Sequence, residues 1–242
     1  MPNCAGWFNV SSGLTMNFVV NEVWPFFFGM LAGFILLGIA VRFFKLKKTA
    51  WVCYILAVIG AGFMLFFFRN PERVPPGDPA AIVAGADGKI MAVKQMREND
   101  FLKTDVVRIS IFLSLLDVHV NRAPVSGKIG FLNYYPGKRY FTFMEKSSEY
   151  NQHSSILIEG GPARCLVNQI VGPVARRVVY WLELGQPVAK GERIGMMKFG
   201  SRLDMYFPAD EVEVIAKPGD RVRAGETVVA RVKSNIEGKE RK

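Results

Sequence analysis

The stretch that decides the fold runs from Met196 to Pro208 and reads MMKFGSRLDMYFP. Apolar residues occupy every second position over a dozen residues, and this alternation predicts a β-strand with one buried face. The apolar positions are Met197, Phe199, Leu203, Met205 and Phe207, and the residues predicted on the opposite face are Lys198, Arg202, Asp204 and Tyr206.

Ser201 is the one polar residue that the alternation places on the apolar face. A buried hydroxyl without a partner costs about 1–3 kcal/mol, so Ser201 either bonds to a specific group or has a chemical task. Gly200 precedes it, and a glycine inside a strand commonly marks a close approach by another group. The pair alone therefore leaves two interpretations, a bulge glycine beside a hydrogen-bonded serine or a reactive Gly-Ser bond.

Residues 1–68 are predicted to form an N-terminal two-helix membrane hairpin. Apolar runs cover residues 23–44 and 50–68, and as helices each is about long enough to cross a ~30 Å hydrocarbon core. No Lys or Arg precedes the first run, which argues against a removable signal peptide. Counting Lys and Arg puts the connection over residues 45–49 in the cytoplasm and the following domain outside. A re-entrant or shallow insertion in one leaflet is the alternative.

Composition favours a membrane partner over nucleic acid. The chain holds 31 Lys and Arg against 21 Asp and Glu, a net charge of +10, and beside a membrane hairpin this excess predicts contact with an anionic membrane surface. The three cysteines lie far apart and there are two histidines with no HExxH pattern. We therefore expect neither a disulfide framework nor a metal site.

After the hairpin, short alternating runs separated by Gly, Pro, Asn and Asp predict a mainly β fold. We expect a compact β-sandwich or barrel-like domain with carrier-like hairpins over residues 69–233, followed by a loose tail over 234–242. The predicted strands cover residues 81–85, 89–93, 106–116, 128–135, 156–159, 163–171 and 177–183.

An internal repeat supports this architecture. The segment GQPVAKGERIG, which starts at Gly185, recurs as GDRVRAGETVV, which starts at Gly219. The matched glycines predict turns and the matched apolar residues predict inward positions, so each copy reads as a tight turn that leads into a strand. The pattern resembles the hairpin of lipoyl and biotinyl carrier domains, but it lacks their attachment lysine motif.

Two polar motifs precede the repeat. Asp87 lies in GADGKI, where Asp-Gly between apolar runs is first of all a turn signal. The segment SLLDVHVNRAP overlaps the end of the predicted strand over 106–116, and if that strand continues, Asp117, His119 and Asn121 share one face. This face is either the exposed face of an edge strand or a site. His153 is predicted in a polar loop.

These motifs, in this order, resemble the phosphatidylserine decarboxylase proenzymes, particularly their short form, from about Phe66 to Val229. The resemblance is carried by FFRNPER, GADGKI, SLLDVHVNRAPVSGKI and GERIGMMKFGSRLDMYFP. It implies self-cleavage between Gly200 and Ser201, with a covalent pyruvoyl group made from Ser201 and no outside cofactor. The implied reaction converts phosphatidylserine to phosphatidylethanolamine and CO2.

The resemblance also implies partners and a location. The α and β chains of the cleaved proenzyme stay associated, and a homodimer is an open expectation. The catalytic domain is expected on the cytoplasmic face of the inner cell membrane, which conflicts with the charge count around the hairpin. We follow the resemblance, because two short basic flanks carry little weight.

The resemblance implies that His119 returns a proton after CO2 leaves and that Asp87 acts in self-cleavage. Longer relatives carry two histidines in a segment like YHRVHMP, whereas this chain has VHVNRAP, so His119 matches the first and Arg122 stands at the second. Either His119 serves both steps, or Asp87 acts with Arg122 or with His153.

Substrate binding is expected from Arg122, Asn121 and Arg202. The guanidinium of Arg202 follows the reactive serine and could hold a carboxylate or phosphate, or could face water.

Two other function classes compete with a lipid decarboxylase. One is a membrane-anchored Ser-Lys hydrolase with Ser201 as nucleophile and Lys198 as base, although the alternation puts Lys198 on the opposite face. The other is a non-catalytic, membrane-tethered carrier-like or adaptor β module, which the internal repeat supports. The intact mass separates them, since only self-processing gives chains of residues 1–200 and 201–242.

Overall fold

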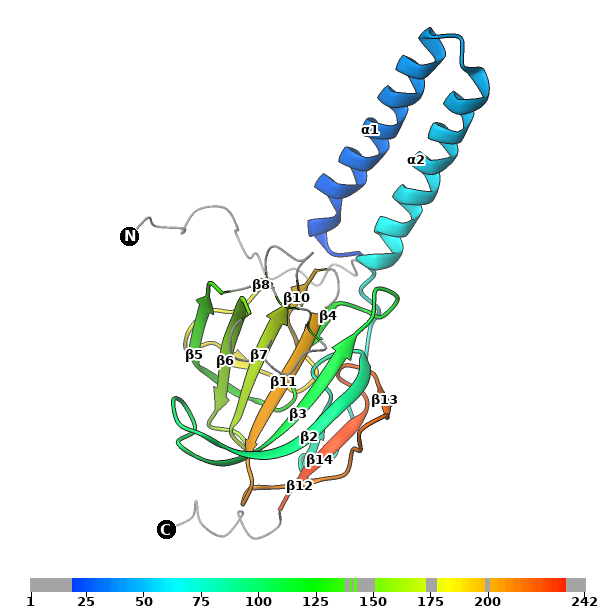
Figure 1. Ribbon diagram of the computed structural model, residues 1–242. Coiled ribbons are helices and arrows are strands. Elements are labelled where there is room, and N and C mark those ends of the chain that lie inside the picture. Colours follow the sequence, from blue (N-terminus) through cyan, green and yellow to red (C-terminus); the bar gives the residue numbers. More distant parts are fainter. Residues whose placement is uncertain are drawn as a thin grey trace.

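Two long helices project from a β domain in the computed structural model (Figure 1), which describes residues 19–137, 140, 142, 151–172, 178–198 and 201–233. After a short 3-10 turn, η1 (Asn21–Val23), the helices are α1 (Trp24–Phe43) and α2 (Lys47–Phe67). By length and composition, both are long and apolar enough to cross a membrane. The predicted tail over 234–242 lies outside the described residues, as do Phe199 and Gly200.

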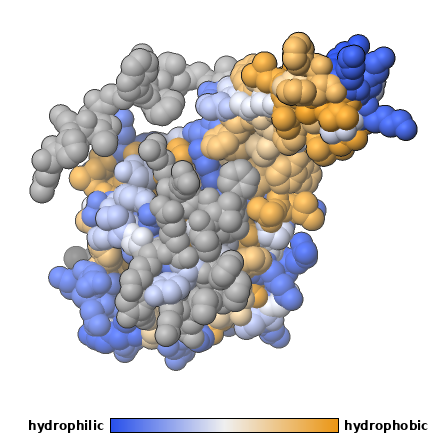
Figure 2. Space-filling model, turned by 45° about the horizontal axis from the view of Figure 1, so that its top comes forward, coloured by the Kyte–Doolittle hydropathy of each residue, from blue (hydrophilic) through white to orange (hydrophobic). Residues whose placement is uncertain are grey.

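The connection between the helices is shorter than predicted, because α2 begins at Lys47 and not at Ala50. Lysine is a good helix former, and its ammonium group reaches water from the first turn of an apolar helix. The helices approach closely at Gly38 and Gly60, where an added Cβ would run into Tyr54 and Met30. In Figure 2 the hairpin is an apolar projection with a hydrophilic tip.

The β domain confirms the prediction of a mainly β fold. Its largest sheet curls and has eight antiparallel strands in the order β13-β2-β3-β11-β7-β6-β5-β9, and two three-stranded sheets have the orders β1-β14-β12 and β4-β10-β8. The strands are β1 (Ala81–Val83), β2 (Gly88–Glu98), β3 (Thr104–Leu113), β4 (Val120–Arg122), β5 (Gly127–Tyr135), β6 (His153–Glu159), β7 (Cys165–Val171), β8 (Val178–Tyr180), β9 (Pro187–Val188), β10 (Arg193–Met197), β11 (Ser201–Pro208), β12 (Val212–Val214), β13 (Arg221–Val222) and β14 (Val228–Val232).

The strand β11 lies in the middle of the large sheet, hydrogen-bonded to β3 on one side and to β7 on the other. Leu203, Met205 and Phe207 point into the main hydrophobic core, as the alternation predicts. The expectation of a single buried face is wrong, because every residue of β11 is buried. On the outer face, Arg202 and Asp204 form a buried ion pair, so their charges are satisfied without water.

The strand β3 ends at Leu113, earlier than the predicted end at Leu116. The backbone N–H and the hydroxyl of Ser114 both donate to the carboxylate of Asp117, at 2.8 and 2.6 Å. Such local side-chain bonds compete with continuation of a strand. The chain therefore turns here, and the expectation that Asp117 shares a strand face with His119 and Asn121 is wrong.

The domain consists of two similar halves. The segment Gly88-Lys89-Ile90 at the start of β2 recurs as Gly127-Lys128-Ile129 at the start of β5, and each copy is bordered by one arm of the internal repeat, β13 or β9. The four repeat glycines all have positive φ, and they are Gly185, Gly191, Gly219 and Gly225. Each repeat arm is therefore a turn that requires glycine, followed by a strand, as predicted.

The base of the helical hairpin packs on the second half of the domain. Phe67 and Phe68 are buried in a cluster with Val118, Val120 and Met196. This cluster fixes the end of α2 against β4 and β10, the strands that flank the segment with His119.

Candidate active site

Ser201 begins β11 in the interior of the domain. It lies opposite Leu113 of β3 and Val171 of β7, both of which are core residues. The side chain has no exposed surface, and within the described part of the chain Oγ has no hydrogen-bond partner. Buried polar groups are nearly always paired, so an unpaired hydroxyl at this position indicates a functional group.

His119 lies in the segment between the Ser114–Asp117 turn and β4. Its Nδ1 is 2.9 Å from the carbonyl oxygen of Asp117, and its backbone oxygen accepts the N–H of Met197 at 3.2 Å. The ring packs against Phe67 with the centroids 4.2 Å apart. Nε2 is buried and has no partner among the residues that the structure describes.

The surroundings of His119 keep its ring neutral. Burial lowers its pKa from 6.5 to about 4, so the imidazole is neutral at physiological pH. A carbonyl oxygen only accepts hydrogen bonds, so the ring proton belongs on Nδ1. Nε2 therefore carries the free lone pair, which is the form that takes up a proton.

Asn121 ends a buried relay of three side chains. Ser154 Oγ donates to Gln169 Oε1 at 2.7 Å, and Gln169 Nε2 donates to Asn121 Oδ1 at 2.7 Å. This order leaves Asn121 Nδ2 buried and without a partner in the described chain. The relay thus fixes the amide so that its two N–H donors are available to a bound group.

The strand pairing places Asn121 beside β10 and its partner Gln169 beside β11. Asn121 of β4 lies opposite Gly195 of β10, and its partner Gln169 lies opposite Leu203, the second residue after Ser201 along β11. Three of the residues predicted from sequence, Ser201, His119 and Asn121, therefore each contribute a buried polar atom that has no partner in the described chain.

Asp87 and Arg122 hold the linker that follows α2. The carboxylate of Asp87 accepts Arg73 Nη2 and the backbone N–H of Ala224, both at 2.8 Å. Arg122 donates to the carbonyl oxygens of Pro71 and Gly191, both at 2.8 Å. Burial and neighbouring arginines lower the pKa of Arg122 to about 10, so it stays charged at neutral pH.

Arg202 is committed to protein groups. Its Nε and Nη2 donate to the two carboxylate oxygens of Asp204 at 2.7 and 3.0 Å, and Nη2 also donates to Ser110. The expectation that it could face water is wrong, since the residue is buried. Its predicted contact with substrate stays a prediction.

His153 lies on the other side of the sheet from Ser201. It begins β6 and is not in a loop, contrary to the prediction. Its ring stacks on Tyr135 with the centroids 4.9 Å apart, and it lines a surface hollow of about 720 Å³ with Tyr206. Tyr206 and Ser201 alternate to opposite faces of β11, so the sheet separates His153 from Ser201.

Sequence reasoning missed Gln169 and Ser154. The signal was present, because CLVNQIV places Gln169 on the same face as Val167 and Val171. Applied to β7, the alternation rule that singled out Ser201 would have found a second polar residue on an apolar face.

The chain matches known proteins over the whole β domain. The family model for phosphatidylserine decarboxylase covers residues 61–230. A phosphatidylserine decarboxylase proenzyme of Desulfotalea psychrophila is 39% identical over 194 residues, which cover 78% of this chain and 90% of that relative. The proenzyme of Carboxydothermus hydrogenoformans is 44% identical over 171 residues, covering 71% of this chain and 80% of the relative.

A third relative extends further along the chain. The proenzyme of Symbiobacterium thermophilum is 37% identical over 215 residues, covering 88% of this chain and 95% of the relative. These matches show that the chain belongs to the phosphatidylserine decarboxylase family.

Proposed function

We propose that this chain cleaves itself between Gly200 and Ser201, and that a pyruvoyl group formed from Ser201 decarboxylates phosphatidylserine to phosphatidylethanolamine and CO2. The observation that carries the proposal is the hydroxyl of Ser201, which is buried at the start of the central strand without a partner in the described chain. A serine hydrolase that uses Lys198 gains no support, because the ammonium of Lys198 lies over the rings of Phe26 and Phe68.

Self-cleavage starts with attack of Ser201 Oγ on the carbonyl carbon of Gly200. Nε2 of His119 takes the hydroxyl proton and gives it to the departing nitrogen, so an ester replaces the amide. Removal of the Cα proton of Ser201 then breaks the Cβ–O bond, and the new carboxylate of Gly200 leaves. Water hydrolyses the remaining dehydroalanine to the ketone and ammonia. The attacking and attacked groups are neighbours in the chain, so the first step needs no collision.

The described residues fit a small carbonyl group at the position of Ser201. The two N–H donors of Asn121 are suited to an anionic oxygen, either of the ketone or of the substrate carboxylate. The pyruvoyl group supplies the carbonyl that condenses with the substrate amine and takes up the electron pair left by CO2.

His119 moves the proton during turnover. A neutral Nε2 takes the proton that the ammonium of the substrate loses on becoming a nucleophile. The protonated ring then returns this proton to the carbon from which CO2 has left. Because its pKa is lowered, the ring starts neutral and has to take up a proton before it can donate one.

Asp87 is proposed to support self-cleavage from outside the serine centre. Its contact with Arg73 joins the linker after α2 to the first half of the domain, and Arg122 joins the same linker to the second half. This arrangement supports a positioning role for Asp87 and Arg122. With its guanidinium already engaged, Arg202 is kept as a weaker candidate for substrate binding.

The domain is proposed to sit at the cytoplasmic face of the inner membrane, with α1 and α2 inserted in the bilayer and the α and β chains associated after cleavage. The length and the apolar surface of both helices support membrane insertion.

The intact mass of the purified full chain tests self-cleavage. We expect two chains, of residues 1–200 and 201–242, with a blocked terminus on the shorter chain and release of CO2 from phosphatidylserine. A single chain of 27.1 kDa with no CO2 release would contradict the proposal.

A further inference from the structure

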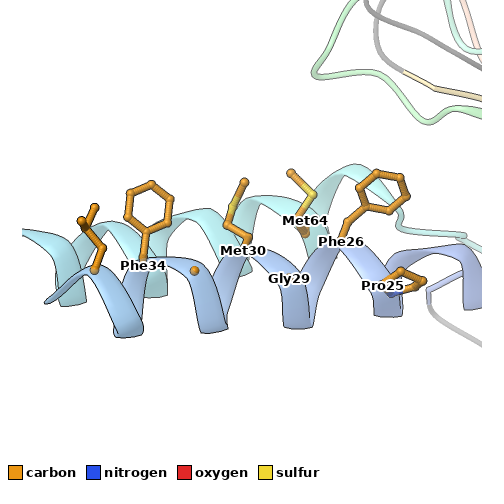
Figure 3. Close-up of a pocket in the computed structure, with 8 residues that line it drawn as sticks. Pro25, Phe26, Gly29, Met30, Phe34 and Met64 are labelled. Atoms are coloured by element: carbon orange, nitrogen blue, oxygen red, sulfur yellow. The ribbon is translucent and has the colours of Figure 1, made fainter. Parts of the chain in front are cut away.

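An apolar groove runs along the helical hairpin. It has a volume of about 550 Å³ and is lined only by apolar residues of α1 and by Met64 of α2. Figure 3 shows the side chains of Phe26, Met30, Phe34 and Met64 beside it. From Pro25 to Leu37 the lining extends about 18 Å at 1.5 Å per residue.

The groove is open along Gly29 and Gly33. An added Cβ at either glycine would meet nothing within 4 Å. Gly38 and Gly60 differ, because there the helices are in contact and a Cβ would collide with the neighbouring helix. The small residues at the groove therefore create space and do not serve close packing of the two helices.

A cation lies at the domain end of the groove. The ammonium nitrogen of Lys198 is 5.0 Å from the ring centroid of Phe26, a groove residue, and 5.9 Å from that of Phe68. The two rings are stacked on each other with the centroids 5.6 Å apart. Lys198 directly follows β10 and stands three residues before Ser201 in the chain.

The same end of the hairpin covers His119. Phe67, the neighbour of Phe68, packs on the imidazole with the centroids 4.2 Å apart. Ring contacts therefore connect the apolar groove, the cation of Lys198 and the imidazole of His119 at this end of the hairpin.

This order matches the parts of one phospholipid molecule. Resting on the proposed function, we propose that the groove binds an acyl chain of the lipid substrate and that Lys198 binds the lipid phosphate. The serine headgroup then extends from Lys198 towards the interior centre. A second copy of the hairpin could fill the apolar groove, but its apolar helices would make no use of the cation at the end.

The test fills the groove with a side chain. Gly33→Leu places a branched apolar group in the groove, and Gly62→Leu is the matched control, because Gly62 is equally open but does not line the groove. The full-length variants are assayed in mixed detergent micelles with dioleoyl phosphatidylserine and with dihexanoyl phosphatidylserine. We expect Gly33→Leu to raise KM for the dioleoyl substrate on the order of tenfold, with KM for the short-chain substrate and self-cleavage unchanged.

The second arm tests the cation. Lys198→Gln should raise KM for both substrates, because both carry the phosphate, while Lys217→Gln, at an exposed turn, should not. Equal KM values for Gly33→Leu and Gly62→Leu would overturn the acyl-chain site. Loss of a crosslinked dimer in Gly33→Leu with unchanged KM would assign the groove to a second copy of the chain. If the wild-type chain does not decarboxylate phosphatidylserine at all, the proposed function itself fails.

Discussion

The two halves of the β domain share their turns and differ at the proposed site. Gly225 N–H donates to the carbonyl of Ala84 at 2.8 Å, and in the other half Gly191 N–H donates to Ala123 at 2.9 Å. The residues of the proposed site are at positions where the two halves differ in sequence. When the halves are aligned on their repeated segments, Ser201 corresponds to the core residue Val167, and Asn121 corresponds to the core residue Ile82. The repeated framework supplies stability, and one polar replacement in each half supplies a group of the proposed site.

Asp87 makes one contact that both halves share and one contact that only its own half has. Its Oδ1 accepts the N–H of Ala224 at 2.8 Å, and at the corresponding position of the other half Oγ of Ser126 accepts the N–H of Lys190 at 2.9 Å. This cap is common to the two halves. The ion pair of the other carboxylate oxygen with Arg73 is the added feature.

The largest effect is expected when Ser201 is replaced by the valine that the other half has at the equivalent position. Ser201→Val gives β11 the residue that β7 has at the equivalent position, and it removes the attacking hydroxyl. We expect one unprocessed chain and no decarboxylation, measured by denaturing electrophoresis and CO2 release. Ser155→Ala, a change at a buried serine on the outer face, is the control and should process normally. Two chains from Ser201→Val would rule out the serine as the precursor.

Removal of the imidazole ranks second. His119→Ala should lower decarboxylation on the order of 10²–10⁴-fold, the typical contribution of a positioned acid or base, and should also slow self-cleavage. His153→Ala should change neither rate, because His153 lies on the opposite face of the sheet. Normal processing and normal turnover in His119→Ala would show that the unpaired Nε2 has no chemical role.

The pH profile of self-cleavage sharpens this assignment. Burial lowers the pKa of His119 from 6.5 to about 4, and only the neutral ring has a lone pair on Nε2. As the pH falls, the rate should therefore hold through pH 6.5 and halve near pH 4, measured on unprocessed chain after a pH jump. A midpoint near 6.5 would mean that His119 is solvated when it acts.

Asp87→Ser separates the hydrogen bond to Ala224, which has an equivalent in the other half, from the ion pair with Arg73, which has none. The serine of the other half should preserve the cap to Ala224 and lose the pair with Arg73. We expect self-cleavage to slow on the order of tenfold, because the buried Arg73 loses one of its two carboxylate partners and keeps only Glu226. Ser126→Ala removes only a cap and should process at the wild-type rate. If Asp87→Ser does the same, Asp87 is a turn residue and nothing more.

The smallest effect is expected from breaking the hydrogen-bond relay of Ser154, Gln169 and Asn121. Gln169→Leu leaves Asn121 Oδ1 without its donor and frees the amide to rotate, so KM for phosphatidylserine should rise several-fold with kcat less affected. Stability should fall by about 1–3 kcal/mol for the lost buried bonds. Ser154→Ala removes only the far end of the relay and should change KM less. An unchanged KM in Gln169→Leu, with the same loss of stability, would make the relay purely structural.

The sequence predicted local features better than distant contacts. Alternation located β11 and the inward position of Ser201, because a polar residue on an apolar face is an exception that pattern alone reveals. The prediction of one strand over residues 196–208 is wrong, because the two methionines at its start belong to β10, which lies in a different sheet. Alternation did not reveal that Arg202 and Asp204 are buried. Two charged residues that form a buried ion pair give the same sequence pattern as two charged residues exposed to water. The turn at Asp117 was missed because a strand and a side-chain cap compete there, and the pattern does not decide between them.

The surroundings of the site were beyond sequence reasoning for a different reason. Phe67 covers His119 although the two are far apart in the chain, and such a contact follows from how the hairpin docks on the domain. The lowered pKa of His119 depends on this burial. The residue was therefore predictable, whereas its protonation state was not.

The central position of β11 has a consequence for the lifetime of the mature enzyme. The proposed cleavage before Ser201 would leave the short chain threaded through the sheet, hydrogen-bonded to β3 and β7 along its first strand and to β1 and β2 through β14 and β13. The two chains have no docking surface that could open and close, because separating them means dismantling the sheet. Dilution should therefore not inactivate the enzyme, and its half-life should equal the time it takes to unfold.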